Sequence, residues 1–311
     1  MSIENGRPLI VGIGEILWDL LPAGKQLGGA PANFAYHAAA LGAAGTVVSR
    51  VGQDDLGREI LDRLDSLGLD RRHVSIDPLH PTGTVEVRLG PGGVPDYVIH
   101  TGVAWDFLSF TPDLSELAAH ADAVCFGTLG QRAPASRAAI GNFLTSLRPE
   151  CLRVFDINLR QNYYNRALVH EMLMHSDVLK LNDAELPIVA GMFGILGQDS
   201  EAVINLMSRY PLKWVALTRG PAGSRLQGIG ESSTHPGFPV DPSVTADTVG
   251  AGDAFTAALA LGLLRGLPLR QINAVANRLA SYVCSQHGAT PPIPAEFREA
   301  LVTTGDAGPG A

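Results

Sequence analysis

Residues 247–255 combine a flexible turn with a carboxylate at the start of an apolar run. Gly250 and Gly252 lack the side chains that would keep a ligand away from the backbone, and the apolar residues from Ala254 onward predict a helix. Free N–H groups at the start of such a helix attract anions. The carboxylate of Asp253 would repel the same anion, so we interpret it as a proton acceptor. The stretch therefore predicts a site where an anion and a base meet.

A second loop of small residues, 27–33, leads into an alanine-rich helix predicted over 34–41. Its glycines allow the backbone to approach a ligand closely. Asn33 stands where it could cap that helix or bind a ligand. Asp19 is either an ordinary loop carboxylate or an acceptor for ligand hydroxyl groups. The residues alone leave both alternatives open.

The order of apolar runs indicates which elements position these residues. Short runs typical of buried strands alternate with helical patterns at 54–67, 255–265 and 269–286; the runs lie at 9–14, 46–51, 123–126, 153–157, 178–181 and 214–218. This alternation predicts an α/β fold with a doubly wound, mostly parallel sheet flanked by helices. Ligands bind outside the carboxyl ends of such strands, and small or polar residues follow four of them, at 127–128, 156–160, 182–185 and 218–223.

Two segments do not fit plain α/β alternation. Residues 84–89 and 96–100 alternate with a period of two around the turn residues 90–93, which predicts a β-hairpin that could form a flap or a dimer surface.

Two familiar glycine motifs of nucleotide-binding proteins are incomplete in this sequence. Gly12 and Gly14 lack the third glycine that a dinucleotide-binding fingerprint would place at Leu17. Gly24-Lys25 likewise lacks the remaining residues of a phosphate-binding P-loop.

Composition excludes several classes of function. The net charge of −8 argues against binding to nucleic acid or to an anionic membrane. No segment is long and apolar enough to span a membrane, and the first residues lack the pattern of a secretion signal. Three widely spaced cysteines predict buried thiols in a reducing cytoplasm, and the nine histidines show no zinc spacing.

Two separated motifs, Gly28-Gly29-Ala30-Pro31-Ala32-Asn33 and Asp247-Thr248-Val249-Gly250-Ala251-Gly252-Asp253, together resemble the PfkB (ribokinase-like) carbohydrate kinase family. Segments 156–160, 182–185, 218–220 and 288–291 extend the resemblance over nearly the whole chain, and residues 14–19, 104–106 and 158–160 look most like fructokinases. The resemblance implies transfer of the ATP γ-phosphate to a hydroxyl of a small sugar, most readily fructose. Ribose, 2-keto-3-deoxygluconate or a nucleoside as the acceptor, and a catalytically silent sugar sensor, stay open as alternatives.

The resemblance also implies a role for each site residue. Asp253 is the expected base, beside an anion hole formed by the amides of Gly250, Ala251 and Gly252. The expected sugar-binding residues are Asp19, Gly29, Asn33, Trp105 and Arg160. The expected nucleotide-binding residues are Asn182, Thr218, Gly220, Gly223 and Asn277. The expected metal residues are Glu185, which would act on Mg²⁺ through water, and Asp247 and Val249, which would lie at a K⁺ site.

Asn182 and Glu185 also have the spacing of a helix capping box, so a structural role competes with the metal role. By the same resemblance, residues 1–14, 34–80 and 105–302 form the α/β core, residues 15–33 and 81–104 form a β lid, and residues 303–311 form a flexible tail. The expected partners are a small sugar and ATP, with no nucleic acid and no membrane. A homodimer through the lid is a further expectation.

Overall fold

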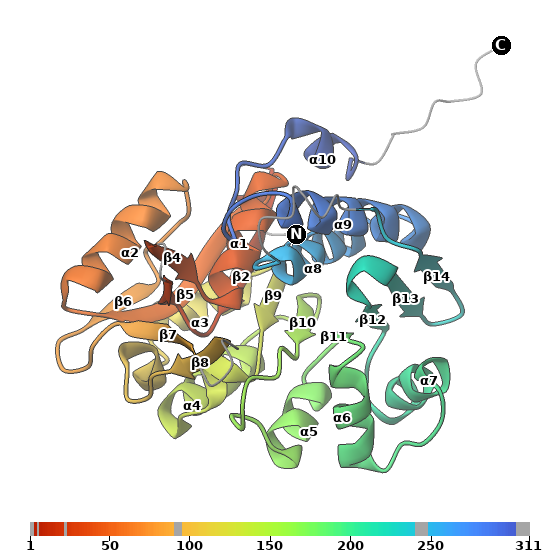
Figure 1. The fold of residues 1–311 in the computed structure, drawn as a ribbon, viewed down its shortest axis with the longest axis horizontal. Coiled ribbons are helices and arrows are strands. Elements are labelled where there is room, and N and C mark those ends of the chain that lie inside the picture. The colour runs from red at the N-terminus through yellow and green to blue at the C-terminus, as the bar shows by residue number, and fades with distance from the viewer. Residues whose placement is uncertain (1–2, 5, 22–23, 90–94, 240–247, 303–311) are drawn as a thin grey trace.

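The computed structural model describes residues 3–4, 6–21, 24–89, 95–239 and 248–302 (Figure 1). A large sheet of ten strands forms the centre of the molecule. Its strands lie in the spatial order β14 (Ser232–His235), β13 (Ser224–Gly228), β12 (Trp214–Thr218), β11 (Val178–Asn182), β10 (Leu152–Asp156), β9 (Ala123–Phe126), β2 (Arg7–Ile13), β5 (Ala44–Gly52) and β6 (Val74–Asp77), with β1 (Ile3–Glu4) beside β2.

All neighbours from β12 to β6 are parallel, whereas β13, β14 and β1 pair antiparallel. The prediction of a doubly wound, mostly parallel sheet is confirmed. The parallel strands end at one edge, so the segments that follow β2, β9, β10, β11 and β12 lie along that edge.

Helices cover both faces of this sheet (Figure 1). One face packs against α3 (Pro112–His120), α4 (Pro134–Thr145), α5 (Arg166–Met174), α6 (Glu185–Phe193) and α7 (Asp199–Arg209). The other packs against α1 (Ala30–Ala40), α8 (Ala251–Leu264), α9 (Leu269–Cys284) and α10 (Ala295–Glu299). Successive side chains of β2 point to opposite faces of the sheet: Ile10 packs on the face that carries α8, and Val11 and Ile13 pack on the other face. Ile60 and Leu64 of α2 (Asp55–Ser66) pack on β5.

A second sheet of four strands lies beside the first. Its order is β4 (Gly24–Gly28), β3 (Leu17–Leu21), β7 (Gly83–Leu89) and β8 (Pro95–Ile99). The antiparallel pair β7–β8 confirms the predicted hairpin, whose turn lies outside the described residues. The prediction of a loop beginning at residue 27 is wrong at its start, because Leu27 and Gly28 belong to β4 and pair with β3. The predicted tail, 303–311, also lies outside the described residues.

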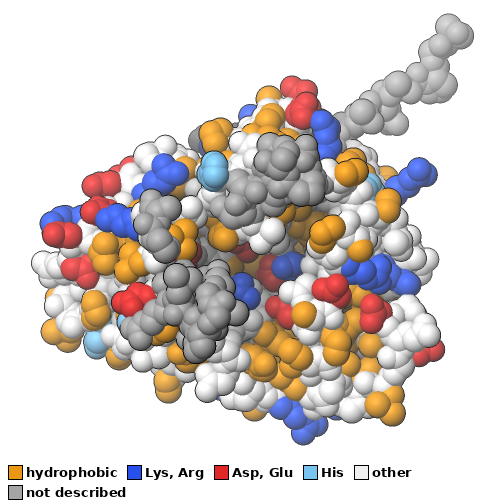
Figure 2. Space-filling model, viewed as in Figure 1, with side chains coloured by type: hydrophobic (Ala, Val, Ile, Leu, Met, Phe, Trp, Pro, Cys, Tyr) orange, Lys and Arg blue, Asp and Glu red, His pale blue; other side chains and the backbone are white. Residues whose placement is uncertain are grey.

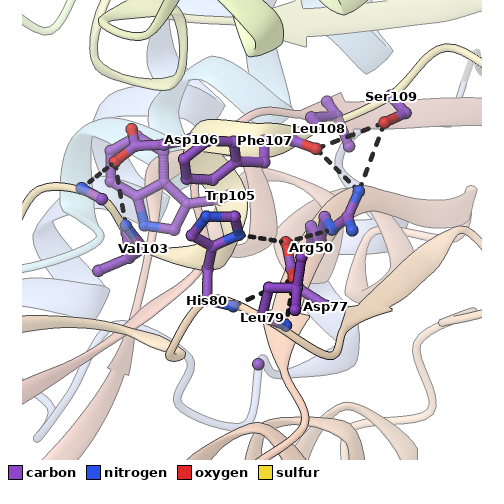
Figure 3. A network of polar contacts seen from close by, with 12 residues as sticks. Arg50, Asp77, Leu79, His80, Val103, Trp105, Asp106, Phe107, Leu108 and Ser109 are labelled. Atoms are coloured by element: carbon purple, nitrogen blue, oxygen red, sulfur yellow. Dashed lines mark hydrogen bonds and ion pairs between the residues drawn. The ribbon is translucent and has the colours of Figure 1, made fainter.

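The chain leaves the large sheet after β6 and returns through the short helix η2 (Ala104–Phe107), and a polar network joins these two segments (Figure 3). The carboxylate of Asp77 accepts hydrogen bonds from the N–H of Leu79 at 2.8 Å and from His80 Nδ1 at 3.0 Å, and it pairs with Arg50 Nε at 2.9 Å. Arg50 Nη1 also donates to the carbonyl of Phe107 at 2.9 Å, and the rings of His80 and Phe107 stack with centroids 3.5 Å apart. The outgoing and returning segments are therefore fixed to each other.

Candidate active site

Segments distant in sequence meet where the carboxyl edge of the large sheet faces the starts of α1 and α8. Figure 2 shows charged side chains of both signs around the hollow near the middle of this face, beside α8 of Figure 1. Each contributing segment follows a strand of the sheet or begins a helix.

Helix α8 begins at Ala251, earlier than the sequence predicts, so Asp253 lies in its first turn. The preceding residue, Gly250, has a φ of 79°, a left-handed conformation that favours glycine. A Cβ at Gly250 would lie 2.5 Å from the carbonyl oxygen of Ala289, so the loop 288–291 packs directly on the turn. The Ala251 N–H lies 3.4 Å from the carbonyl of Thr248, a long contact that leaves this donor weakly engaged.

The carboxylate of Asp253 is held from the opposite helix. Asn33 Nδ2 donates to Asp253 Oδ2 at 2.8 Å, joining α1 to α8 across 220 residues of sequence. Burial raises the pKa of Asp253 to about 6, and the negative charge of Asp156 adds to the shift. The Asn33 bond and the charges of Lys180 and Arg160 oppose it. The result is a carboxylate that is ionised at neutral pH yet a stronger base than an exposed aspartate.

The start of α1 explains the position of Asn33. Pro31 occupies the first turn, where a missing N–H costs little, and Gly29 with a φ of 112° precedes the helix. The interpretation of Asn33 as an N-cap is therefore wrong, since the helix starts four residues earlier than predicted and Asn33 faces Asp253 instead. A Cβ at Gly29 would lie 2.5 Å from the carbonyl oxygen of Glu15, so glycine is required where the two segments cross.

Asp19 and Arg160 approach the site from different sheets. Asp19 lies on β3, and a Cβ at Gly28 would be 2.4 Å from its Oδ2, so the carboxylate lies flat against β4. Burial raises the pKa of Asp19 to about 6, whereas the charge of Arg160 lowers it. Arg160 follows β10 and is exposed, and its charge also acts on Glu15 and Asp253. The structure thus brings Asp19, Arg160 and Asp253 within electrostatic range of one another.

A buried ion pair that the motifs do not indicate supports the first turn of α8. Lys180 Nζ lies 3.0 Å from Asp156 Oδ1, and Thr256 Oγ1 lies 2.9 Å from Asp156 Oδ2 and 2.8 Å from the carbonyl of Gly252. A Cβ at Gly252 would be 3.0 Å from the Lys180 ammonium. The signal was present, because Lys180 interrupts an apolar strand, where an unpaired charge would be costly.

Lys180 is surrounded by negative charge. Although burial alone would lower the pKa of Lys180, the carboxylates of Asp156, Glu185 and Asp253 raise it. The ammonium therefore stays charged beneath the glycine turn. It adds positive charge to a place where the helix start already attracts anions.

Glu15 is a further buried residue of the site, with no role implied by the motifs. It is 3% exposed and lies two residues after the end of β2. Burial raises the pKa of Glu15 to about 7, while hydrogen bonds from backbone N–H groups, including that of Ala30, oppose the shift and the charge of Asp253 adds to it. Its place after a buried strand and Gly14 was a usable signal, but the partners could not be read from spacing.

Asn182 and Glu185 bond reciprocally at the start of α6. Asn182 Oδ1 accepts from the N–H of Glu185 at 2.9 Å, and Glu185 Oε2 accepts from the N–H of Asn182 at 2.8 Å. Glu185 Oε1 accepts from the N–H of Leu159 at 2.9 Å, which ties this helix start to the segment after β10. The reciprocal hydrogen bonds expected of a capping box are therefore present, and they hold the Glu185 carboxylate in one orientation.

Trp105 lies in η2 and is 1% exposed. It packs with Leu17, Val85 and Leu129 between the small sheet and the core, and a Cβ at Gly83 would be 2.4 Å from its Nε1. The ring is thus part of a packed cluster rather than an open surface. Contact between this ring and a sugar stays a prediction.

The expected nucleotide residues fall on one turn and one buried network. Thr218 ends β12, and the turn η4 (Gly220–Ala222) separates Gly220 from Gly223. Gly220 has a φ of 52° with open space around it, whereas a Cβ at Gly223 would be 2.0 Å from the carbonyl of His235. Asn277 of α9 donates to Ser224 Oγ at 2.7 Å and is 7% exposed, so its amide is engaged inside the protein.

The expected K⁺ residues are only partly described. Asp247 lies outside the described residues, and Val249 is 43% exposed in the turn before α8. The carbonyls of Ala289 and Pro291 nearby accept hydrogen bonds from His37 Nε2 at 2.9 Å and from the Tyr36 hydroxyl at 2.7 Å.

Among the described residues, no group of three or more His, Cys, Asp or Glu side chains could hold a metal ion, and no helix is long and apolar enough to cross a membrane. Cys125 and Cys151 are buried free thiols, and Cys284 is partly buried. Burial raises the pKa of Cys151 to about 12, so this thiol is a poor nucleophile.

The sequence matches known proteins over most of its length. Residues 23–296 match the model of the pfkB family carbohydrate kinases. The chain is 28% identical to a putative sugar kinase of Pyrococcus horikoshii over 300 residues, covering 90% of this chain and 91% of that one. It is 31% identical to a fructokinase of Klebsiella pneumoniae over 280 residues, covering 85% of this chain and 87% of that one.

A solved structure agrees with the fold. The crystal structure of the Pyrococcus horikoshii sugar kinase in complex with ATP superposes with a TM-score of 0.79 at 28% identity, covering 94% of this chain and 100% of that one. The architecture of the two sheets is therefore shared with a protein that binds ATP.

Proposed function

The chain belongs to the pfkB family of carbohydrate kinases, which transfer phosphate from ATP to a sugar, and from that premise we propose that its acceptor is fructose and its catalytic base is Asp253. The observation that carries the assignment of the base is the 2.8 Å hydrogen bond from Asn33 to Asp253. It unites the two separated glycine-rich motifs in one site. The name of the Klebsiella pneumoniae relative supports fructose as the acceptor.

The proposed reaction uses Asp253 to take the proton of a sugar hydroxyl as its oxygen attacks the γ-phosphorus of ATP. The bond between the γ-phosphorus and the β–γ bridging oxygen breaks, and ADP leaves with that oxygen. Phosphoryl transfer requires mainly positioning and stabilisation of charge. The pKa of about 6 for Asp253, raised by burial, suits a base that must be ionised near neutral pH and still accept a proton.

The proposed anion hole consists of the amides of Gly250, Ala251 and Gly252. Glycine at position 250 permits the turn, and the fixed N–H groups need no reorganisation when charge develops on the phosphoryl oxygens. Loss of one such donor typically costs about 3 kcal/mol of barrier. The Lys180 ammonium below Gly252 adds a charge of the required sign.

The proposed sugar subsite is formed by Asp19, Gly29, Asn33 and Arg160, with Trp105 behind them. Carboxylate and amide groups recognise neighbouring hydroxyls, and the guanidinium suits phosphoryl oxygens. Residues 15–33 and 81–104 act in this proposal as a lid that excludes water from the site. A homodimer formed through the outer face of the lid is part of the same proposal.

The proposed nucleotide subsite is the turn that carries Thr218, Gly220 and Gly223, with Asn182 at the phosphate end and Asn277 behind the turn. Glu185 fits a hydrated Mg²⁺ ion, because its carboxylate is fixed by two backbone N–H groups and keeps lone pairs for water. When bound, Mg²⁺ would offset charge on the β- and γ-phosphates. The proposed K⁺ site at Asp247 and Val249 predicts that added KCl raises activity more than NaCl does.

A panel assay tests the proposal. Release of ADP would be measured with fructose, ribose, 2-keto-3-deoxygluconate and a nucleoside, and we expect the highest kcat/KM for fructose. Asp253→Asn keeps the shape and removes the base, so turnover should fall by about two to four orders of magnitude with little change in ATP binding. Asp65→Asn on the surface of α2 serves as a matched control. Sugar binding by calorimetry without any turnover would instead identify a sugar sensor.

A further inference from the structure

The loop that carries Arg160 has an unusual backbone. Asn158 and Gln161, on either side of Arg160, are the non-glycine residues with positive φ in the described part of the chain, at 42° and 46°. Such conformations persist only where the surroundings hold them. The Arg160 guanidinium donates to the backbone carbonyl of Leu159 in the same loop at 3.2 Å. The position of Arg160 therefore depends on what holds the loop.

Tyr163 fixes the end of this loop to the small sheet. Its N–H donates to the carbonyl of Arg160 at 3.1 Å, and its hydroxyl donates to the carbonyl of Ile99 at 3.3 Å, at the end of β8. Arg132 supports the ring, with the guanidinium carbon 4.9 Å from the Tyr163 centroid. The same guanidinium carbon lies 3.9 Å from the centroid of Trp105, so it contacts both aromatic rings.

Arg132 also fixes the segment that returns from the small sheet. Its Nε and Nη2 donate to the two oxygens of Asp106 at 2.8 and 2.9 Å, and both side chains are 4% exposed. Asp106 Oδ2 in turn accepts from the N–H groups of Gly102 at 2.8 Å and Val103 at 3.2 Å. Arg132 Nη2 also donates to the carbonyl of His100. One buried guanidinium therefore contacts the small sheet's return segment and, through Tyr163, the Arg160 loop.

We propose that Arg132 is a positioning residue that couples the placement of Arg160 to that of the four-stranded sheet, an inference that rests on the proposed role of Arg160 in the sugar subsite. The sheet carries Asp19, and the charge of Arg160 acts on Asp19 as well as on Asp253. Displacement of the sheet thus moves the Arg160 loop with it. The planar guanidinium is required, because lysine lacks both the two parallel N–H groups that bond the two oxygens of Asp106 and the flat face that contacts the aromatic rings.

A double-mutant cycle tests this coupling. Arg160→Ala should lower kcat/KM for the sugar about 10- to 100-fold, and Arg132→Lys should lower it about tenfold with little change in the KM for ATP. In the Arg160→Ala background, Arg132→Lys should have almost no further effect. A full tenfold further loss, or no effect of either single substitution, would overturn the proposal.

Hydrogen–deuterium exchange separates failure of this inference from failure of the proposed function, because it needs no turnover. In Arg132→Lys, exchange should become about tenfold faster in residues 158–163 and 99–103 together. Arg148→Lys is the matched control, since Arg148 pairs with buried Asp122 at the opposite end of β2. If 158–163 exchange as in the wild type, Arg132 does not hold the loop, whatever sugar the enzyme phosphorylates.

Discussion

Substitutions in the Lys180–Asp156 ion pair should shift the pH dependence of kcat/KM, in a direction set by the charge that is removed. Lys180 lowers the pKa of Asp253 and Asp156 raises it. If Asp253 is the base, kcat/KM should rise with pH through about 6, where this carboxyl ionises. Lys180→Met should move this acid limb to higher pH, and Asp156→Asn should move it to lower pH.

Lys180→Met should also lower the stability of the protein, by an amount that follows from the distance between the two charges. An ammonium and a carboxylate 3.0 Å apart attract each other by roughly 5 kcal/mol at an effective dielectric constant of about 20. Removing only Lys180 leaves the buried Asp156 charge uncompensated, so the free energy of unfolding should fall by about 3–5 kcal/mol. The double variant Lys180→Met/Asp156→Asn contains neither charge and should recover most of this loss.

The assay is the pH dependence of kcat/KM for the sugar between pH 5 and 8, combined with urea unfolding of each variant. The two single variants serve as controls for each other, because their limbs should move in opposite directions. Limbs that move in the same direction, or that do not move, would refute the electrostatic account of Asp253. A double variant that regains stability but stays poorly active would show that the charged pair contributes to the reaction as well as to the fold.

Three further predictions concern single residues. Gly250→Ala places a Cβ 2.5 Å from the Ala289 carbonyl at a φ of 79°, so turnover should fall at least tenfold, and unchanged steady-state kinetics would contradict the described turn. Glu15→Gln should stabilise the protein by about 2–3 kcal/mol at pH 8 and by little at pH 4. Burial raises the pKa of Glu15 to about 7, so the wild-type protein loses stability as the pH rises from about 4.5 to about 7. Urea unfolding at both pH values checks this, and an equal effect at both would refute it. Thr256→Val removes a buried hydroxyl beside Asp156, so the free energy of unfolding should fall by about 1–3 kcal/mol while the KM for ATP stays unchanged, as thermal unfolding and kinetics would show.

The sequence predicted the parts of the fold that depend on local pattern. The buried strands and the β7–β8 hairpin lie close to their predicted positions, because strand periodicity is set by neighbouring residues. The starts of α1 and α8 were placed too late, since the small residues before Phe34 and Ala254 resemble a loop in composition. Strands β3 and β4 pair with partners whose register only the tertiary structure supplies.

The same distinction applies to the site. Asp253 and Asn33 could be selected because each stands in a motif of distinctive composition, and the structure places them in hydrogen-bonding distance. Lys180 stands out in the sequence as a charge within an apolar strand, but its partner could not be inferred from that signal, because the pair with Asp156 forms between two parallel strands. Glu15 is similar, because its raised pKa comes first from burial in the folded protein and then from the charge of Asp253, which lies far along the chain.

The connectivity of the small sheet has a consequence for synthesis of the protein. Strands β3 and β7 pair in parallel, yet α1, β5, α2 and β6 lie between them in the chain. At about 5–20 residues per second, the ribosome needs roughly 3–12 s to make the intervening segment. During that interval the β3–β4 hairpin has an unpaired edge, which other nascent chains can bind. Molecular chaperones that shield this hairpin should therefore increase the yield of active enzyme more than chaperones that bind only the strands of the large sheet.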